Sequence, residues 1–340
     1  MSNLVLGIDI GGTKIATGAV DEHGQIVKSV QVSTHASRTK EEILNQVFLS
    51  VEKILESGIN LKDIRGIGVG APGPLKEGIL INPPNIAAWQ NFPIAKLITE
   101  KYGLPTFAEN DANAAAYAEL VFGAAKGYKN FVYVTVSTGI GTGIIIDGKI
   151  YRGMNGLAGE GGHVCINYDQ DINAHSKVGV LGSVENLASG TAIAKEAQRL
   201  LRQNPKTETS LLKFVKTDES GKHKDKDGNI CEISLSKITT YEIGEAIKEN
   251  DEFSKNLIKR AGHLIGVWMG GIISLLDPEI IVIGGGVMEI GEVLLEQIRE
   301  TAPKFTINQF ASNTPIIPAG LKGQVGIQGA ASLIHQRLTR

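Results

Sequence analysis

The sequence is poor in cysteine, in net charge and in long apolar runs. Its two cysteines, Cys165 and Cys231, are too few for a disulfide framework and fit a reducing compartment. The 34 basic and 36 acidic residues nearly cancel, so we expect neither a nucleic-acid nor a membrane surface. No apolar stretch approaches the ~18 residues of a membrane span. The N-terminus lacks the features of a signal peptide, and we therefore expect a cytoplasmic protein.

Two common nucleotide-binding motifs are missing as well. No G-x-x-x-x-G-K-[ST] run opens a helix, as a P-loop requires, and the glycines at 284–286 lack the G-x-G-x-x-G spacing of a dinucleotide-binding fold. Glycine itself is abundant, with 41 of 340 residues, and many glycines gather at the ends of predicted strands. The backbone can approach a ligand closely at such places. A chain of this length also predicts two domains rather than one.

The most informative segment is LVLGIDIGGTKIATGAV at 4–20. Its pattern predicts a strand, a tight glycine turn and a second strand. The turn offers backbone N–H groups, the hydroxyl of Thr13, the ammonium of Lys14 and the carboxylate of Asp9, which together suit a phosphate and its magnesium ion. An ordinary hairpin would show the same pattern. A weaker copy follows at 131–147, with a predicted Gly/Thr turn at 138–143, and two such hairpins would clamp a nucleotide between domains.

Hydrophobic periodicity predicts the remaining elements. We expect helices at 40–57, 94–102, 111–122, 239–250, 253–276 and 326–340, and further strands at 64–69, 106–108, 280–283 and 315–317. Residues 203–237 are polar with a charge-dense centre, which predicts an exposed insertion with a hairpin near 227–229. A functional lid is the alternative for this insertion.

Asn110 and Asp111 form the strongest catalytic candidate. They follow a predicted strand and open a predicted helix, a position at the carboxyl edge of a sheet where ligands bind in open α/β folds. An aspartate there can accept a proton from a substrate hydroxyl while the asparagine binds a second hydroxyl. The alternative is that Asp111 simply caps the helix.

Polar residues in two further glycine-rich places suit a polyol ligand. Glu160 and His163 lie three residues apart, and Glu185 opens a predicted helix, so all three could bind hydroxyl groups. A structural or metal-binding role is the alternative for His163, and compensation of the helix dipole is the alternative for Glu185. Gly284, Gly285 and Gly286 form a strand-to-helix turn that would admit a flat ring or a phosphate.

The order of these pieces resembles that of the ROK family (repressors, open reading frames and sugar kinases) in the actin-like ATPase superfamily. The matching motifs are DIGGTK at 9–14, GAPGPL at 70–75, NPPNIAAW at 82–89, ENDANAAA at 109–116, TVSTGIGTGIIIDG at 135–148, GEGGH at 159–163, ENLASGTAI at 185–193 and LLDPEIIVIGGGV at 275–287. The resemblance implies an α/β, two-domain actin-like ATPase (ribonuclease H-like) fold with an interdomain cleft. The smaller domain would comprise residues 1–115 plus 326–340, and the larger would comprise 116–325 with the insertion at 203–237.

The resemblance also implies an activity. We expect an ATP- and Mg²⁺-dependent hexose kinase, a phosphotransferase acting on an alcohol group, most of all a glucokinase of glycolysis that works as a homodimer. The alternatives are an N-acetylmannosamine or N-acetylglucosamine kinase, a fructokinase, a kinase using polyphosphate, or a non-catalytic sugar-sensing regulator. Repressors of the family carry a DNA-binding domain ahead of the first motif, whereas eight residues precede Asp9 here.

The resemblance assigns roles to individual residues. Asp111 would be the catalytic base. The sugar would be surrounded by Asn85, Asn110, Asp111, Glu160, His163 and Glu185. ATP would be bound by Asp9, Gly11, Gly12, Thr13, Lys14, Thr138, Gly139, Gly284, Gly285 and Gly286, with Asp9 reaching Mg²⁺ through phosphate or water.

One departure from the family pattern concerns zinc. Most members carry three cysteines that join the GH histidine, His163 here, to bind zinc. At those three positions this sequence has Ser176, Val178 and Ser183. A structural zinc ion needs four nitrogen or sulfur ligands, and His163, Cys165 and His175 offer at most three at the wrong spacing. We therefore expect no structural zinc.

Overall fold

The computed structural model describes residues 3–83, 85–167, 180–215, 232–307, 309–310 and 313–338. The chain divides into two compact units. Unit 1 comprises residues 1–133, 142–159 and 319–340, and unit 2 comprises residues 134–141 and 160–318. Two of the boundaries fall inside strands, β8 (Phe131–Val136) and β9 (Ile140–Ile146). The domain limits at residues 115 and 325 stay a prediction.

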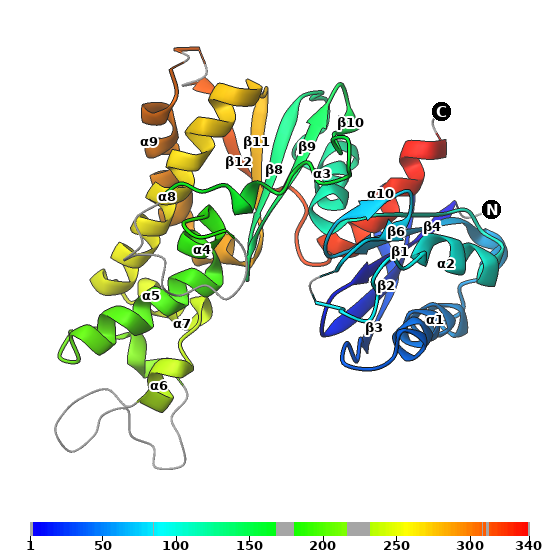
Figure 1. Cartoon of the computed structure of the whole chain (residues 1–340), viewed down its shortest axis with the longest axis horizontal. Helices are drawn as coiled ribbons and strands as arrows, with labels where there is room; N and C mark the ends of the chain where they lie inside the picture. Colours follow the sequence, from blue (N-terminus) through cyan, green and yellow to red (C-terminus); the bar gives the residue numbers. More distant parts are fainter. Residues whose placement is uncertain are drawn as a thin grey trace. The chain divides into compact units, whose positions relative to one another are not determined.

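Unit 1 is built on a mixed sheet with the strand order β3-β2-β1-β4-β7 (Figure 1). The predicted hairpin forms β1 (Leu4–Ile10) and β2 (Lys14–Val20), and β3 (Ile26–Ser33) follows. β2 pairs antiparallel with both β1 and β3. β4 (Ile64–Ala71) and β7 (Thr106–Asn110) extend the sheet in parallel with β1. Asp9 pairs with Gly70, and Gly70 pairs with Glu109. The carboxyl ends of β1, β4 and β7 therefore lie at one edge of the sheet.

Helices cover both faces of this sheet. The alternation along β1 sends Leu6 and Ile8 into a core with α1 (Lys40–Glu56) and α2 (Ile94–Tyr102), and sends Val5 toward α10 (Val325–Leu338). α10 also packs along α3 (Asp111–Val121). A Cβ atom on Gly7 would lie 2.0 Å from the Ile327 carbonyl oxygen. This glycine therefore lets α10 pack directly on the strand backbone.

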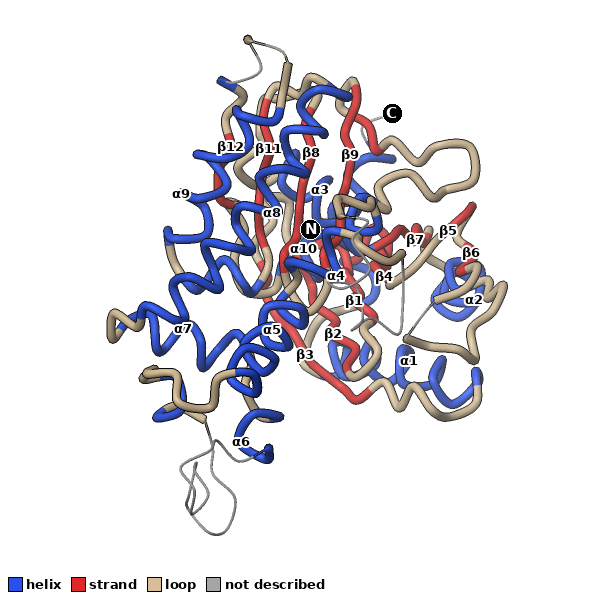
Figure 2. Tube along the Cα trace, turned by 60° about the vertical axis from the view of Figure 1, so that its left-hand side comes forward, coloured by secondary structure: helices blue, strands red, loops and turns tan. Residues whose placement is uncertain are grey.

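The second five-stranded sheet has the order β10-β9-β8-β11-β12, with β10 at Lys149–Ile150, β11 at Ile280–Gly284 and β12 at Ile316–Pro318. Unit 2 adds the helices α4 (Val184–Ala188), α5 (Gly190–Gln203), α6 (Glu232–Ser236), α7 (Thr240–Lys248), α8 (Glu252–Leu276) and α9 (Glu292–Thr301). α8 and α9 lie side by side (Figure 2), and α7 also contacts α8. A Cβ atom on Gly266 would lie 2.5 Å from the Thr301 Cβ, so this glycine of α8 permits the close approach of α9.

Short elements complete the described part of the chain. β5 (Leu75–Lys76) and β6 (Ile79–Leu80) form a small hairpin. Single 3₁₀ turns occur at η1 (Leu61–Asp63), η2 (Gly161–His163), η4 (Leu211–Lys213), η5 (Gly286–Ile290) and η6 (Ala302–Phe305).

Two sequence predictions are wrong in part. The Gly/Thr turn predicted at 138–143 ends early, because the β-branched residues Ile140 and Thr142 already belong to β9. The ends of the 203–237 insertion are not wholly exposed, because Leu211 and Leu235 are buried. The predicted hairpin at 227–229 lies outside the described residues.

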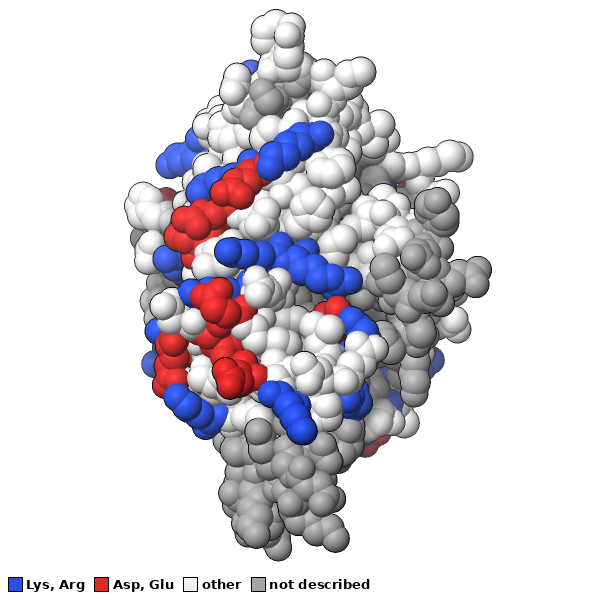
Figure 3. All heavy atoms as spheres, turned by 90° about the vertical axis from the view of Figure 1, so that its left-hand side faces the viewer, with Lys and Arg blue, Asp and Glu red and all other residues white. Residues whose placement is uncertain are grey.

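The surface carries charges of both signs. On the face shown in Figure 3, acidic and basic side chains lie next to one another. In unit 2, Lys248 pairs with Glu245 in α7, and Lys255 pairs with Glu252 in α8. The two members of each pair are three residues apart in the sequence. Of the helices in the described part of the chain, none is long and apolar enough to cross a membrane.

Candidate active site

The turn between β1 and β2 is held firmly by backbone contacts. The Gly11 N–H donates to the Lys14 carbonyl at 2.9 Å. The buried Thr34, which follows β3 directly, donates its hydroxyl to the Gly11 carbonyl at 2.6 Å and its N–H to the Thr13 carbonyl at 3.0 Å. The side chains of Thr13 and Lys14 remain exposed. The turn is therefore fixed from within while its polar side chains face solvent, and Thr34 is a contributor that the sequence motif did not reveal.

Asp9, at the end of β1, lies against the first turn of α10. A Cβ atom on Gly326 would lie 2.2 Å from Asp9 Oδ2, so only glycine leaves room for the carboxylate there. Burial and then the negative charge of Asp111 raise the pKa of Asp9 from 3.8 to about 6, against the opposing effect of Lys14. Asp9, Lys14 and Asp111 are thus close enough to interact electrostatically.

Asn110 caps α3, and Asp111 is the first residue of that helix. Asn110 Oδ1 accepts the N–H groups of Ala112 at 3.0 Å and Asn113 at 3.2 Å, while its Nδ2 donates to the Gly73 carbonyl at 3.3 Å. The capping role considered for Asp111 therefore belongs to Asn110. Asp111 Oδ1 accepts the Ala112 N–H at 2.8 Å. Its negative charge lies where the helix dipole favours an anion.

Asn85 lies next to the turn between β1 and β2. A Cβ atom on Gly12 would lie 2.9 Å from Asn85 Cβ, so the two residues are in contact. Unit 1 therefore brings together one predicted sugar-binding residue, Asn85, and the predicted phosphate-binding turn.

The second predicted phosphate turn, in unit 2, is attached to the start of α5. The Ser137 N–H donates to the Gly139 carbonyl at 2.8 Å, and the Gly190 N–H and Thr191 hydroxyl donate to the carbonyls of Ser137 and Thr138, each at 2.8 Å. Glu185 Oε2 accepts the Ile140 N–H at 2.9 Å. The predicted opening of a helix at Glu185 is correct, since α4 begins at Val184.

A pocket of about 640 Å³ in unit 2 adjoins this turn. It lies between the 137–138 and 286–290 segments and the helices α5 and α7, and its lining includes Thr138, Thr191, Tyr241 and Gly286. The volume falls in the range of small-molecule sites. Gly285 has φ of +98°, and a Cβ atom there would lie 2.3 Å from the Val136 carbonyl oxygen. The three glycines at 284–286 therefore form a turn that the backbone of β8 approaches closely.

Glu160 and His163 meet at the start of η2. Glu160 Oε2 lies 3.7 Å from His163 Nε2, and the His163 N–H donates to the Glu160 carbonyl at 3.1 Å. Both side chains keep partial solvent exposure. In the described structure, the buried Nδ1 atom of His163 has no hydrogen-bond partner.

The residues at the family's zinc positions do not fit a zinc ion. Ser183 is buried and its hydroxyl accepts the Asn186 N–H at 3.4 Å as the cap of α4; a serine hydroxyl and a valine side chain are not zinc ligands. His175, Ser176 and Val178 lie outside the described residues. Among those described, no three His, Cys, Asp or Glu side chains could hold a metal ion together. Instead, 164–167 pairs with 180–184, as in the 2.8 Å bond from the Ile166 N–H to the Gly182 carbonyl.

Comparison with known proteins identifies the family. The model of the ROK family matches residues 5–337. The chain belongs to the ROK family. The glucokinase of Thermotoga maritima is 30% identical over 336 residues, which cover 98% of each chain. A ROK family glucokinase from Streptomyces griseus, crystallised with glucose and AMPPNP, is 32% identical with a TM-score of 0.80, covering 98% of this chain and 99% of that one.

The similarity extends to regulators of the same family. A xylose repressor of Caldicellulosiruptor bescii is 28% identical, covering 97% of this chain and 77% of the repressor. The predicted family and the predicted α/β actin-like ATPase fold class are confirmed. The roles of the individual site residues stay predictions.

Proposed function

We propose that this ROK protein is an ATP-dependent hexose kinase that transfers the γ-phosphate to a sugar hydroxyl, with glucose as the leading substrate. The observation that carries the proposal is geometric: Asp9 ends β1 at the same edge of the sheet at which Asp111 begins α3, beside the Gly11–Lys14 turn. A carboxylate base next to a phosphate-binding turn is what phosphoryl transfer to a hydroxyl requires. The glucokinase relatives support glucose within this class.

Asp111 is the proposed catalytic base. Its position at the first residue of α3 fixes the carboxylate, because the Ala112 N–H holds Oδ1. The carboxylate would accept the proton of the attacking hydroxyl, and the proposed sugar ligands Asn85, Asn110, Glu160, His163 and Glu185 would orient that hydroxyl. Asn110 already uses its carbonyl oxygen and one amide hydrogen within the protein, so it would contribute to the sugar through its other amide hydrogen.

ATP would bind to both glycine-rich turns. In unit 1 the N–H groups of Gly11–Thr13 and the Lys14 ammonium would meet the phosphates. In unit 2 the 640 Å³ pocket beside Thr138 and Gly286 would take the nucleoside. This pocket favours ATP over polyphosphate as donor, because its lining includes the acidic residues Glu245 and Glu289 as well as lysines.

A magnesium ion fits the carboxylates of unit 1. Mg²⁺ is usually held by one or two carboxylates together with substrate phosphates, and the ionisation of the Asp9 carboxyl is opposed by burial and then by the nearby charge of Asp111. A cation there would relieve this repulsion. When bound, Mg²⁺ would neutralise charge on the phosphates during transfer. A cytoplasmic location, a role in glycolysis and a homodimer remain predictions from the family.

A coupled assay tests the proposal. Purified protein is incubated with ATP or polyphosphate and a panel of hexoses, ketohexoses and N-acetylhexosamines, and ADP release is compared with and without sugar. We expect ATP-dependent phosphorylation with glucose as the best acceptor. Phosphorylation of an N-acetylhexosamine alone would reassign the substrate. Sugar binding without any phosphorylation would instead favour a sugar-sensing regulator.

A further inference from the structure

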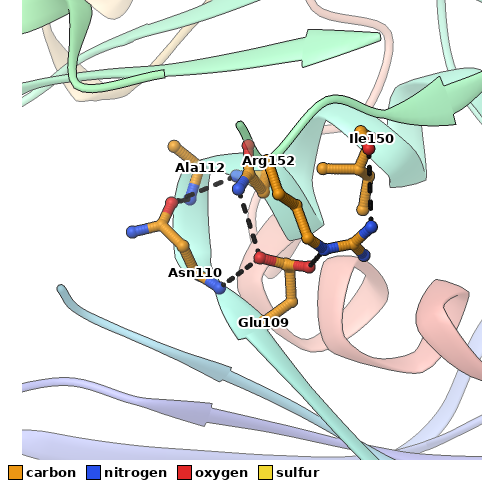
Figure 4. Close-up of polar contacts among 6 residues, drawn as sticks. Glu109, Asn110, Ala112, Ile150 and Arg152 are labelled. Atoms are coloured by element: carbon orange, nitrogen blue, oxygen red, sulfur yellow. Dashed lines mark hydrogen bonds and ion pairs between the residues drawn. The ribbon is translucent and has the colours of Figure 1, made fainter. Parts of the chain in front are cut away.

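Glu109, the residue before Asn110, is a buried carboxylate whose two oxygens are both bonded within the protein (Figure 4). Oε2 accepts Arg152 Nε at 2.6 Å. Oε1 accepts the Asn110 N–H and Asn113 Nδ2, both at 3.1 Å. One carboxylate therefore spans residues 110–113, and Asp111 lies within that span.

Arg152 supplies the charge that this carboxylate needs. Glu109 is only 4% exposed, and a buried carboxylate without a cation is strongly unfavourable. Nε of Arg152 makes the short bond, and Nη1 reaches the Ile150 carbonyl at 3.4 Å. The guanidinium is thus oriented by two contacts within unit 1.

Arg152 also begins the loop that leads to Glu160. Its carbonyl accepts the Ala158 N–H at 3.1 Å, which closes the loop. Gly159 follows with φ of +94°, and a Cβ atom there would lie 2.7 Å from the Thr142 carbonyl oxygen and 3.6 Å from Asn113 Oδ1. The loop therefore begins at Arg152, which is bonded to Glu109, and ends at Gly159, which lies near Asn113. Glu160 is the next residue along the chain.

We propose that the Glu109–Arg152 ion pair is a positioning device for the hexose-kinase site. It keeps the first turn of α3, with Asp111, in register with the 152–159 loop that leads to Glu160, and it acts without touching the substrate. The proposal rests on the proposed kinase function. Displacement of a catalytic group by about 1 Å can lower a rate by about 10²-fold, so loss of this pair should affect turnover.

The test compares Arg152→Met with a matched arginine elsewhere. We expect kcat for the hexose to fall roughly 10- to 100-fold while KM for ATP changes by less than about twofold. Arg152→Lys should recover part of the loss, because an ammonium can still donate to Glu109. Arg260→Met is the control: Arg260 pairs with the mostly buried Glu196 at 3.3 Å, and its side chain is 41% exposed against 42% for Arg152. It should leave kcat unchanged.

A double-mutant cycle with Glu109→Gln separates positioning from direct substrate contact. If Arg152 acts through Glu109, adding Arg152→Met to Glu109→Gln should change kcat by less than about twofold. Losses that multiply in the double variant would overturn the proposal, and so would wild-type kcat in folded Arg152→Met. Thermal melting measures folding separately, and Arg152→Lys and Glu109→Gln carry the test if Arg152→Met does not fold. A wild-type protein inactive on every sugar would refute the kinase function instead.

Discussion

Asp9 should make the stability of the protein fall as the pH rises. Burial raises its pKa to about 6 in the folded chain, against an ordinary value of 3.8, so the folded state binds the proton more tightly than the unfolded state. The resulting contribution is fully present below pH 3.8 and is lost as the pH rises through about 6. A shift of about 2 units at 1.36 kcal/mol per unit amounts to about 3 kcal/mol, an upper bound because Asp9 keeps partial solvent contact.

The substitution Asp9→Asn removes this titration and keeps the side-chain shape. Urea denaturation of both proteins at a series of pH values from 4 to 8 gives the difference in unfolding free energy. We expect the variant to gain up to about 3 kcal/mol relative to wild type between pH 4 and pH 7.5, with most of the change between pH 4 and pH 6. Parallel stability curves for the two proteins would refute the reasoning.

Two neighbouring substitutions serve as controls because they change the same pKa in opposite directions. Asp111→Asn removes a negative charge, so it should lower the pKa of Asp9 and flatten the pH dependence. Lys14→Met removes a cation, so it should raise the pKa and extend the loss of stability to higher pH. An equal effect of both variants would show that burial alone controls the ionisation of Asp9.

Three further predictions concern stability and metal content. Glu119→Gln should destabilise the protein by about 2 to 3 kcal/mol in thermal melts, because the buried carboxylate accepts three backbone N–H groups, from Ala124, Gly320 and Leu321; unchanged melting would contradict this. Gly285→Ala should lower the unfolding free energy of the protein by more than about 2 kcal/mol, because φ at this position is positive and a Cβ would meet Val136. Gly271→Ala, at an open site in α8, should instead raise the unfolding free energy by about 1 kcal/mol. The opposite order of the two stabilities would contradict this prediction. Elemental analysis should find no stoichiometric zinc. One tightly bound zinc equivalent per chain would contradict the expectation that Ser183 and its neighbours leave the protein without a structural zinc site.

The features that the sequence predicted well depend on local patterns. The hairpin at 4–20 alternates apolar residues around a glycine turn, and β1 and β2 have the expected places. The junction of β7 and α3 is marked by a short strand followed by an alanine-rich helix, which places Asp111 at the sheet edge. Local signals of this kind do not depend on the rest of the fold.

The missed features depend on partners far apart in the sequence. Thr34 reaches the Gly11 carbonyl from the residue that follows β3, and Arg152 reaches Glu109 across 43 positions. No sequence motif contains both members of such a pair, so their contact becomes evident only in the folded structure. The choice of Asn110 rather than Asp111 as helix cap was missed for a different reason. Both residue types favour the cap, and only the backbone geometry decides which one occupies it.

We propose that Asp111 removes a proton from a sugar hydroxyl during transfer of the γ-phosphate of ATP. The most direct measurement is the formation of glucose phosphate by wild type and Asp111→Asn under saturating ATP and glucose. We expect sugar-dependent phosphorylation by wild type and a fall of about 10²- to 10⁴-fold in kcat for the variant, with KM for ATP nearly unchanged. Phosphorylation by Asp111→Asn at a rate near that of wild type would show that Asp111 is not the catalytic base.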